Sequence, residues 1–126
     1  AVPIETGLRG DASLVVSDAD TALALRSGTV EVLGTPRLIA LCEEATMAAL
    51  FDRLPPGQTT VGMRVQIDHL QPTAVGQTVM AEAVLERIEG RRLTFTVSAS
   101  DAKGLVAAGK VTRVVVQVDR FLAKSD

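Results

Sequence analysis

Two adjacent carboxylates, Glu43 and Glu44, lie in the middle of the most apolar stretch of the chain, LGTPRLIALCEEATMAALF. They are the only charged residues between positions 38 and 51, a run that is expected to form a buried helix. Burying a carboxylate costs roughly several kcal/mol unless the group is paired or protonated. A carboxylate kept at such a place is therefore a candidate for acid–base or nucleophilic chemistry, although both residues could also reach solvent or a subunit interface. Neighbouring helical residues point about 100° apart, so at most one of the two faces a given pocket.

Three further residues could take part in chemistry, and each also has a structural explanation. His69 is the only histidine and stands beside the turn PTAVG, where it is either a surface residue or a proton-transfer group. Thr35 is expected to be the helix N-cap, with Pro36 in the first turn, where its missing N–H costs nothing. Gly62 interrupts a β-branched run, which is typical of a bulge or of a close backbone approach.

Other catalytic classes find no support in the residues. Cys42 is the only cysteine, lies in the apolar helix, and is expected to be a packed thiol. One histidine and one cysteine cannot make a typical zinc site, so no metal is expected. The sequence holds no GxSxG, P-loop or GxGxxG motif, so we expect no nucleotide cofactor and no serine nucleophile.

Composition narrows the class of protein. The 126 residues fit one domain, residues 1–126, and 47% of them are apolar, enough for a core. A net charge of −2 and three aromatic residues argue against nucleic-acid binding. A lone cysteine fits a reducing compartment, and neither a signal core nor an apolar run of about 18 residues is found. We therefore expect a soluble cytoplasmic protein without membrane contact.

The elements that must position these residues follow from periodicity and turn chemistry. A short strand is expected at 12–17, a short helix or loop at 17–28, and the apolar helix ends at RLPPGQ. Four long β-branched segments follow, separated by Gly- and Pro-containing turns, at 59–70, 76–90, 91–102 and 105–119. Within them, Val79, Ala81, Ala83, Leu85 and Ile88 suggest one apolar face with an irregularity near its end, and Leu93, Phe95, Val97 and Ala99 another.

A helix that is apolar nearly all round must be covered on most sides. An antiparallel sheet curled around this helix meets that demand and predicts an α+β fold. Small residues in the helix, among them Ala45 and Ala49, allow the sheet to approach closely. A second copy of the chain is the expected cover for any side that the sheet leaves open.

This architecture is the hotdog fold, and the chain resembles hotdog-fold acyl-CoA thioesterases, more narrowly the fluoroacetyl-CoA thioesterase-like group. The resemblance spans about residues 29–121 and is carried by GTPRLIALCEEA, VGMRVQIDHLQPTAVGQTV and VLERIEGRRLTFTVSASD. In that family a Thr precedes the helix, an acid follows two turns later, and the next strand holds a Gly and a His. The matching positions here are Thr35, Glu43, Gly62 and His69.

The resemblance implies a role for each of these residues in hydrolysing a short-chain acyl-CoA thioester. Glu43 would be the general base or the nucleophile, and His69 would assist the leaving thiolate or orient the acid. Thr35 would position the thioester or the water, and Gly62 would let the carbonyl reach a backbone N–H as an oxyanion site. Glu44 would then be a surface, interface or structural acid.

Partners and alternatives follow from the same comparison. We expect a homodimer, or a tetramer of two dimers, with acyl-CoA as substrate and coenzyme A only as part of it. Arg91 and Arg92 at a hairpin turn are candidates for the CoA phosphates, as well as for a solvated tip. The segment before the helix, ALALRSGTVEVL, lacks the aromatic lid residues that the resemblance implies, which argues against fluoroacetyl-CoA as the substrate. An acyl-CoA-binding protein without turnover and a hotdog hydratase or dehydratase are the alternatives.

Overall fold

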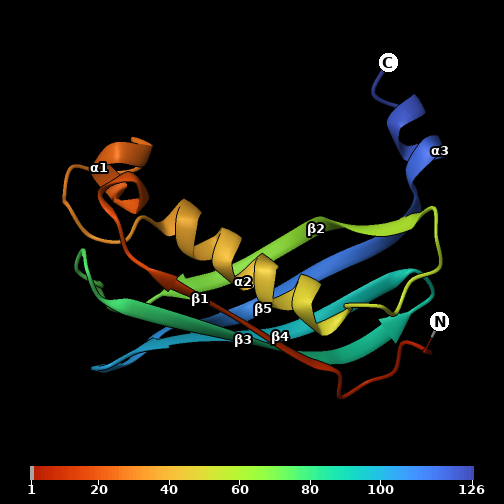
Figure 1. Ribbon diagram of the computed structural model, residues 1–126, viewed down its shortest axis with the longest axis horizontal. Coiled ribbons are helices and arrows are strands. Elements are labelled where there is room, and N and C mark those ends of the chain that lie inside the picture. The colour runs from red at the N-terminus through yellow and green to blue at the C-terminus, as the bar shows by residue number, and fades with distance from the viewer. Residues whose placement is uncertain (1) are drawn as a thin grey trace.

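The computed structural model describes residues 2–126. One long helix, α2 (Thr35–Ala49), lies against a sheet of five strands (Figure 1). The strands are β1 (Arg9–Val15), β2 (Gln58–His69), β3 (Thr78–Glu89), β4 (Arg92–Asp101) and β5 (Gly104–Gln117). Three short helices complete the chain: a 3-10 turn (Asp18–Asp20), α1 (Ala22–Leu25) and α3 (Val118–Ala123).

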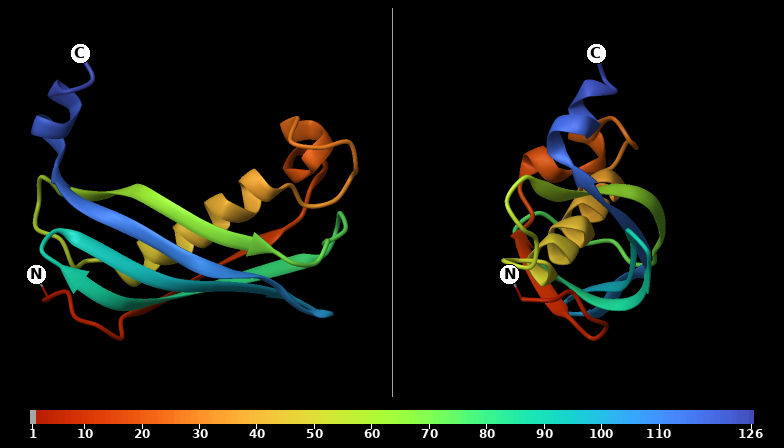
Figure 2. Two further views of the ribbon diagram at one scale, coloured as in Figure 1. Left: turned by 180° about the vertical axis from the view of Figure 1, so that it is seen from behind. Right: turned by 90° about the vertical axis from the view of Figure 1, so that its right-hand side faces the viewer.

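The sheet is antiparallel throughout, in the order β1-β3-β4-β5-β2. It curls around α2 like a half-barrel, as the end-on view shows (Figure 2). This is the helix wrapped by a curved antiparallel sheet that the sequence predicts, and the α+β fold class is confirmed. Since β1 and β2 are the outermost strands, each has one edge without a partner strand within the described chain. The edge strand β2 carries both Gly62 and His69.

The core lies between α2 and the concave face of the sheet. Leu38, Leu41, Cys42 and Ala45 of the helix are fully buried against the inward residues of β3 and β4. Gly10 on β1 lies so close to the helix backbone at Ala45 and Ala49 that a Cβ there would overlap it. A glycine on the strand and alanines on the helix therefore set the depth at which α2 sits in the sheet.

The structure refines several expected boundaries. The first strand is Arg9–Val15 instead of 12–17, and the following segment contains both a turn and the short helix α1. The last strand ends at Gln117, before the expected position 119, and α3 was not anticipated. A bulge between Leu85 and Arg87 is the expected irregularity, and it keeps Ile88, which pairs with the buried Leu93, on the same face as Leu85, although Ile88 is 38% exposed near the end of the strand. Across residues 2–126, no helix is long and apolar enough to cross a membrane.

The start of α2 differs from the expectation in a way that matters for the site. Gly34 is the N-cap, and no side chain caps the first turn. The Gly34 carbonyl accepts the amides of Arg37 and Leu38 at 3.1 and 3.0 Å. A side chain at position 34 would crowd Ala22 of α1, so close packing of α1 selects glycine. Thr35 is thus the first helical residue, and the prediction that its hydroxyl caps the helix is wrong.

Candidate active site

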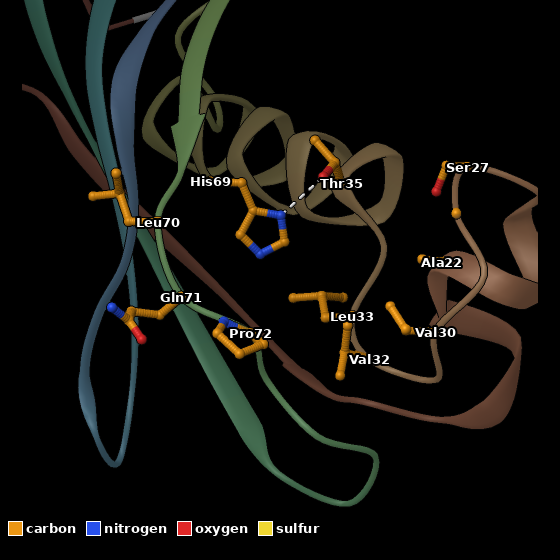
Figure 3. Close-up of a pocket in the computed structure, with 11 residues that line it drawn as sticks. Ala22, Ser27, Val30, Val32, Leu33, Thr35, His69, Leu70, Gln71 and Pro72 are labelled. Atoms are coloured by element: carbon orange, nitrogen blue, oxygen red, sulfur yellow. Dashed lines mark hydrogen bonds between the residues drawn. The ribbon is translucent and has the colours of Figure 1, made fainter.

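The Thr35 hydroxyl, released from capping, is bonded to a histidine. Thr35 Oγ1 lies 2.9 Å from His69 Nδ1, which joins the first turn of α2 to the last residue of β2 (Figure 3). These two residues are 34 positions apart in the sequence. The structure therefore brings together two of the four residues that the family resemblance singled out.

The other ring nitrogen of His69 has no protein partner. His69 Nε2 is buried and makes no hydrogen bond to any of residues 2–126. Burial lowers the pKa of His69 below its usual 6.5, and the backbone of Gln71 offsets part of this effect. A neutral imidazole at physiological pH can donate from one nitrogen and accept at the other. An unpaired buried nitrogen is a position that a ligand or another chain can satisfy.

A pocket of about 320 Å³ opens beside this pair (Figure 3). One wall comes from α1 and the loop that leads to α2, and the other comes from the segment that follows β2. Apart from Thr35 and His69, most of its lining is small or aliphatic: Ala22, Gly28, Val30, Val32, Leu33, Leu70 and Pro72. Such a lining accommodates a small apolar group close to the imidazole.

The helix acid Glu43 is held by a buried arginine. Arg113 Nη1 donates to Glu43 Oε2 at 3.1 Å. Two further donors of the same guanidinium bind Thr60: Nε donates to its hydroxyl at 2.8 Å and Nη2 to its carbonyl oxygen at 3.0 Å. The Arg113 side chain is only 7% exposed, whereas that of Glu43 is 33% exposed. Glu43 thus has a fixed carboxylate that remains accessible from outside the core.

Gly62 leaves the room for that carboxylate. A Cβ at this position would overlap Glu43 Oε2, so any side chain here would displace the acid. Gly62 pairs with Arg113 across the β2–β5 ladder, and the register shifts between Gly62 and Arg64. The bulge and the missing side chain together put the β2 backbone directly against Glu43. The structure therefore brings Glu43 and Gly62 together as a second pair.

Within one chain the two pairs are separate. Glu43 lies eight residues after Thr35, about 12 Å along the helix axis. Gly62 and His69 are seven residues apart on β2, roughly 23 Å along the strand. Neither Glu43 nor Gly62 lines the pocket beside His69. A single chain therefore presents the predicted site residues as two pairs at different places along α2 and β2.

The neighbours of Glu43 on the helix take no part in either half. Glu44 is exposed and bonds Arg37 at 2.8 Å, and Arg37 also contacts Asp20 at 3.4 Å. Glu44 is thus a surface acid that ties α2 to the turn before α1. Cys42 is buried, and burial beside Glu43 raises the pKa of its thiol to about 11, so it is the packed thiol that the sequence suggests.

The two hairpin arginines have different surroundings. Arg91 lines two adjoining surface hollows at the end of the sheet next to α3. Arg92 begins β4 opposite Val114 and lines neither hollow. Both lie outside the two halves of the site described above.

Sequence reasoning missed Arg113. It lies in the run GKVTRVVVQV, which reads as an ordinary β-branched strand. The position of Arg113 in the strand could have revealed it. Alternate residues of a strand face the same side, and Val111 and Val115, two residues before and after Arg113, both pack toward the core. A cation on the buried face of a strand requires a carboxylate partner, and the apolar helix offers two.

Comparison with known proteins supports this fold. A solved structure of the fluoroacetyl-CoA thioesterase FlK is 30% identical, with 98% of this chain and 96% of that one covered at a TM-score of 0.93. A crystal structure of a Thermus thermophilus thioesterase superfamily member is 26% identical, with coverages of 98% and 91% and a TM-score of 0.89. The fold is therefore that of the hotdog thioesterases, and the chain is an enzyme, a thioester hydrolase.

Sequence comparisons also show to which thioesterase family within this fold the chain belongs. The model of the fluoroacetyl-CoA-specific thioesterase family matches residues 16–119. The fluoroacetyl-CoA thioesterase of Streptantibioticus cattleyicolor is 35% identical over 94 residues, which is 75% of this chain and 68% of that protein. The chain belongs to this thioesterase family, and the resemblance drawn from the sequence is confirmed.

Proposed function

We propose that this protein hydrolyses a short-chain acyl-CoA thioester to a carboxylic acid and free coenzyme A. The observation that carries the proposal is the accessible Glu43 carboxylate, held by the buried Arg113 against the bare backbone of Gly62. Relatives with this fold support the choice of substrate. One solved structure of the fluoroacetyl-CoA thioesterase, 30% identical with a TM-score of 0.88, is a complex with fluoroacetate and CoA. Coenzyme A enters as part of the substrate, and no cofactor is required.

The chemistry assigned to the four residues is thioester hydrolysis. Glu43 either removes a proton from the attacking water or attacks the carbonyl itself to form an anhydride that water then opens. The developing oxyanion is placed at the backbone near Gly62, where no side chain blocks the approach of a carbonyl. His69, held by the Thr35 hydroxyl, assists departure of the sulfur, and the thiolate leaves as the thiol after taking up a proton.

The two halves of the site require a second chain. Within residues 2–126 the outer edge of β2 has no partner strand, and because the register shifts between Gly62 and Arg64, the middle of the ladder from Gly62 to His69 falls at Gln66. Antiparallel pairing of β2 with its copy about that midpoint sets Gly62 of one protomer opposite the partner's His69. A two-fold homodimer built in this way contains two complete sites, each with Glu43 and Gly62 from one chain and Thr35 and His69 from the other.

Exposed apolar residues support the same interface. Met63 and Val65 on the free edge of β2 are 46% and 38% exposed, and Phe51 at the end of α2 is 81% exposed. Free strand edges with apolar residues are normally covered in native proteins. Pairing of two β2 edges covers Met63 and Val65, and the open side of α2 is covered by the partner in the same arrangement.

The acyl group that fits best is a small aliphatic one. The pocket beside His69 has a volume of about 320 Å³, and no Phe, Tyr or Trp lines it. The relatives are named for fluoroacetyl-CoA. The aliphatic wall formed by Val30, Val32 and Leu33 favours a short or branched alkyl acyl group over selection of a fluoromethyl group.

The direct test is release of free thiol from a panel of acyl-CoAs that runs from acetyl and fluoroacetyl to branched and medium-chain esters. We expect turnover on a narrow group of short aliphatic esters, and loss of most turnover in the Glu43→Gln variant. Glu44→Gln is the matched control, because Glu44 stands next to Glu43 but pairs only with the surface residue Arg37. Wild-type turnover in Glu43→Gln would refute the assignment of the acid. Absence of turnover on the whole panel would refute the proposed substrate class.

A further inference from the structure

Two opposite charges on the edge strand β2, Arg64 and Asp68, have no ionic partner within residues 2–126. Both residues are exposed. Their directly opposite neighbours on β5 are Thr112 and Ala108, and neither of these carries a charge. The edge strand therefore presents an arginine and an aspartate, four positions apart, that nothing on the described chain neutralises.

Both charges lie on the convex face of the sheet, which points away from α2 (Figure 2). Val111 of β5 is fully buried in the core, and successive residues of a strand alternate between faces, so Thr112 and Ala108 point outward. Directly opposite residues of an antiparallel pair share a face. Arg64 and Asp68 therefore point outward as well, and both stand at the edge of the sheet that a second chain would meet.

The cation nearest to Asp68 on this face is already occupied. Lys110 of β5 lies opposite Gln66, between the positions of Arg64 and Asp68. Its ammonium group is bonded to Glu86 at 3.0 Å. This leaves the partner of Asp68 to come from outside the chain.

A two-fold axis at Gln66 brings these charges together between two copies. When Gln66 lies opposite the partner's Gln66, Arg64 lies opposite the partner's Asp68, and Asp68 lies opposite the partner's Arg64. The Cβ atoms of opposite residues are then about 5 Å apart, a distance that an arginine–aspartate ion pair spans. The symmetric arrangement therefore contains two ion pairs, with the two glutamine amides between them as mutual donors and acceptors.

Other registers lose both ion pairs. An axis moved by one residue puts the partner's Gln66 opposite Arg64 or Asp68. An axis moved by two residues puts Arg64 or Asp68 opposite its own copy, and like charges directly opposite each other are destabilising. Each one-residue move of the axis also slides the strands by about 7 Å, which carries the partner's His69 away from Gly62. The charges therefore favour the register that a shared site needs.

We propose that Arg64 and Asp68 form two ion pairs with a second copy of this chain across the β2 edges, and that these pairs fix the register in which Gly62 meets the partner's His69. The inference rests on the proposed function, because it takes the site to be shared between chains. It adds the residues by which one β2 edge recognises another. An edge with different charges at these positions is rejected, so the chain selects its own copy.

Charge reversal tests the proposal without a substrate. The Arg64→Asp chain has acids at both positions and the Asp68→Arg chain has bases at both, so each homodimer contains two like-charge contacts. We expect the dissociation constant of each homodimer to rise by about tenfold. An equal mixture of the two chains, refolded together, restores opposite charges at both contacts. Native mass spectrometry should then find about nine-tenths of the dimers as the mixed species, against about half for random pairing.

The matched control makes the same charge changes on the other free edge of the sheet. Arg9→Asp and Asp11→Arg lie on β1, and both residues are exposed. Their mixture should contain only the half of mixed dimers that random pairing gives. Random pairing of the β2 variants, an equal preference in the β1 variants, or a wild type that stays monomeric would overturn the proposal.

A second variant keeps the test decisive if a single reversal prevents folding. Arg64→Asp/Asp68→Arg exchanges the two charges, so its homodimer again contains two ion pairs and should dissociate as the wild type does. Mixed with wild type, it would form like-charge contacts, and the two chains should sort into homodimers with far fewer than half of the dimers mixed. Free mixing of this variant with wild type would overturn the proposal.

Thiol release from the acyl-CoA panel separates this inference from the proposed function. The mixed dimer of Arg64→Asp and Asp68→Arg is expected to regain wild-type turnover, because it restores the register of both sites. The expected pairing preferences without turnover, even in the wild type, would support the ion pairs and refute hydrolysis alone. Conversely, wild-type turnover with random pairing of the β2 variants would leave hydrolysis standing and refute the ion pairs.

Discussion

The backbone of Gly62 on β2 lies so close to Glu43 Oε2 on α2 that a Cβ at position 62 would overlap this carboxylate oxygen. The carboxylate can keep its position only if residue 62 has no side chain. The identity of residue 62 therefore determines where the Glu43 carboxylate lies.

Gly62→Ala should therefore impair catalysis while the fold remains intact. The φ angle of Gly62 is not positive, so alanine fits the backbone and only the contact with Glu43 is lost. Moving the carboxylate off Arg113 by about 1 Å should lower kcat/KM on the best substrate by about a hundredfold. The measurement is steady-state thiol release beside a thermal melt. Full activity of Gly62→Ala would show that Glu43 does not act from this position.

Two inactive variants should restore activity when they are combined, if each site is shared between chains. In a mixed dimer of Glu43→Gln and His69→Ala, one site contains both substitutions and the other contains neither. After co-refolding or subunit exchange, random pairing should recover about a quarter of wild-type activity. The two variants assayed separately are the controls. Failure of the mixture to exceed them, with exchange demonstrated by mass, would mean that the site lies within a single chain.

The Glu43–Arg113 pair should contribute more to stability than the neighbouring surface pair. Arg113→Ala leaves Glu43 without its cation and removes both bonds to Thr60. We expect the free energy of unfolding to fall by about 2–4 kcal/mol, at or below the usual range for a broken buried pair because Glu43 is one-third exposed. Arg37→Ala breaks the exposed pair with Glu44 and should cost less than about 1 kcal/mol. Urea denaturation of both variants measures the difference, and equal losses would contradict it.

The lowered pKa of His69 predicts a dependence of stability on pH. The unfolded chain takes up a proton at this residue near pH 6.5, whereas the folded chain does so only at lower pH. Protonation of His69 therefore does not affect the free energy of unfolding above about pH 6.5. Below that pH the free energy of unfolding falls, by less than about 1.4 kcal/mol per pH unit. The difference in free energy of unfolding between wild type and His69→Asn should shrink between pH 7.5 and 5.5. A difference that is constant over this range would show that the His69 pKa is not lowered.

Most of the fold was predictable because strong local signals agree with the tertiary structure. The segments around β2, β3 and β4 are β-branched and bounded by turns, and the buried face of β4 alternates as expected. Two features escaped because neighbours in space decide them. Gly34 caps α2 only because α1 packs against it, and α3 follows a run of valines that reads as continuing strand.

The candidate site was predictable in residue type but not in geometry. Spacing and resemblance pointed to Thr35, Glu43, Gly62 and His69, yet the structure of one chain separates them into two pairs. Nothing in a linear sequence indicates that two distant points on one strand would face each other in the proposed symmetric dimer. Arg113 escaped for a related reason, because its partner lies on an element 70 positions away.

The burial of Cys42 has a consequence for an enzyme whose product is itself a thiol. With no accessible surface and a pKa of about 11, this sulfur holds almost no thiolate at neutral pH. Released coenzyme A, even when oxidised to its disulfide, then has no reactive cysteine on residues 2–126 to which it could attach. The enzyme can therefore release coenzyme A over many turnovers without forming a mixed disulfide with its own product at Cys42.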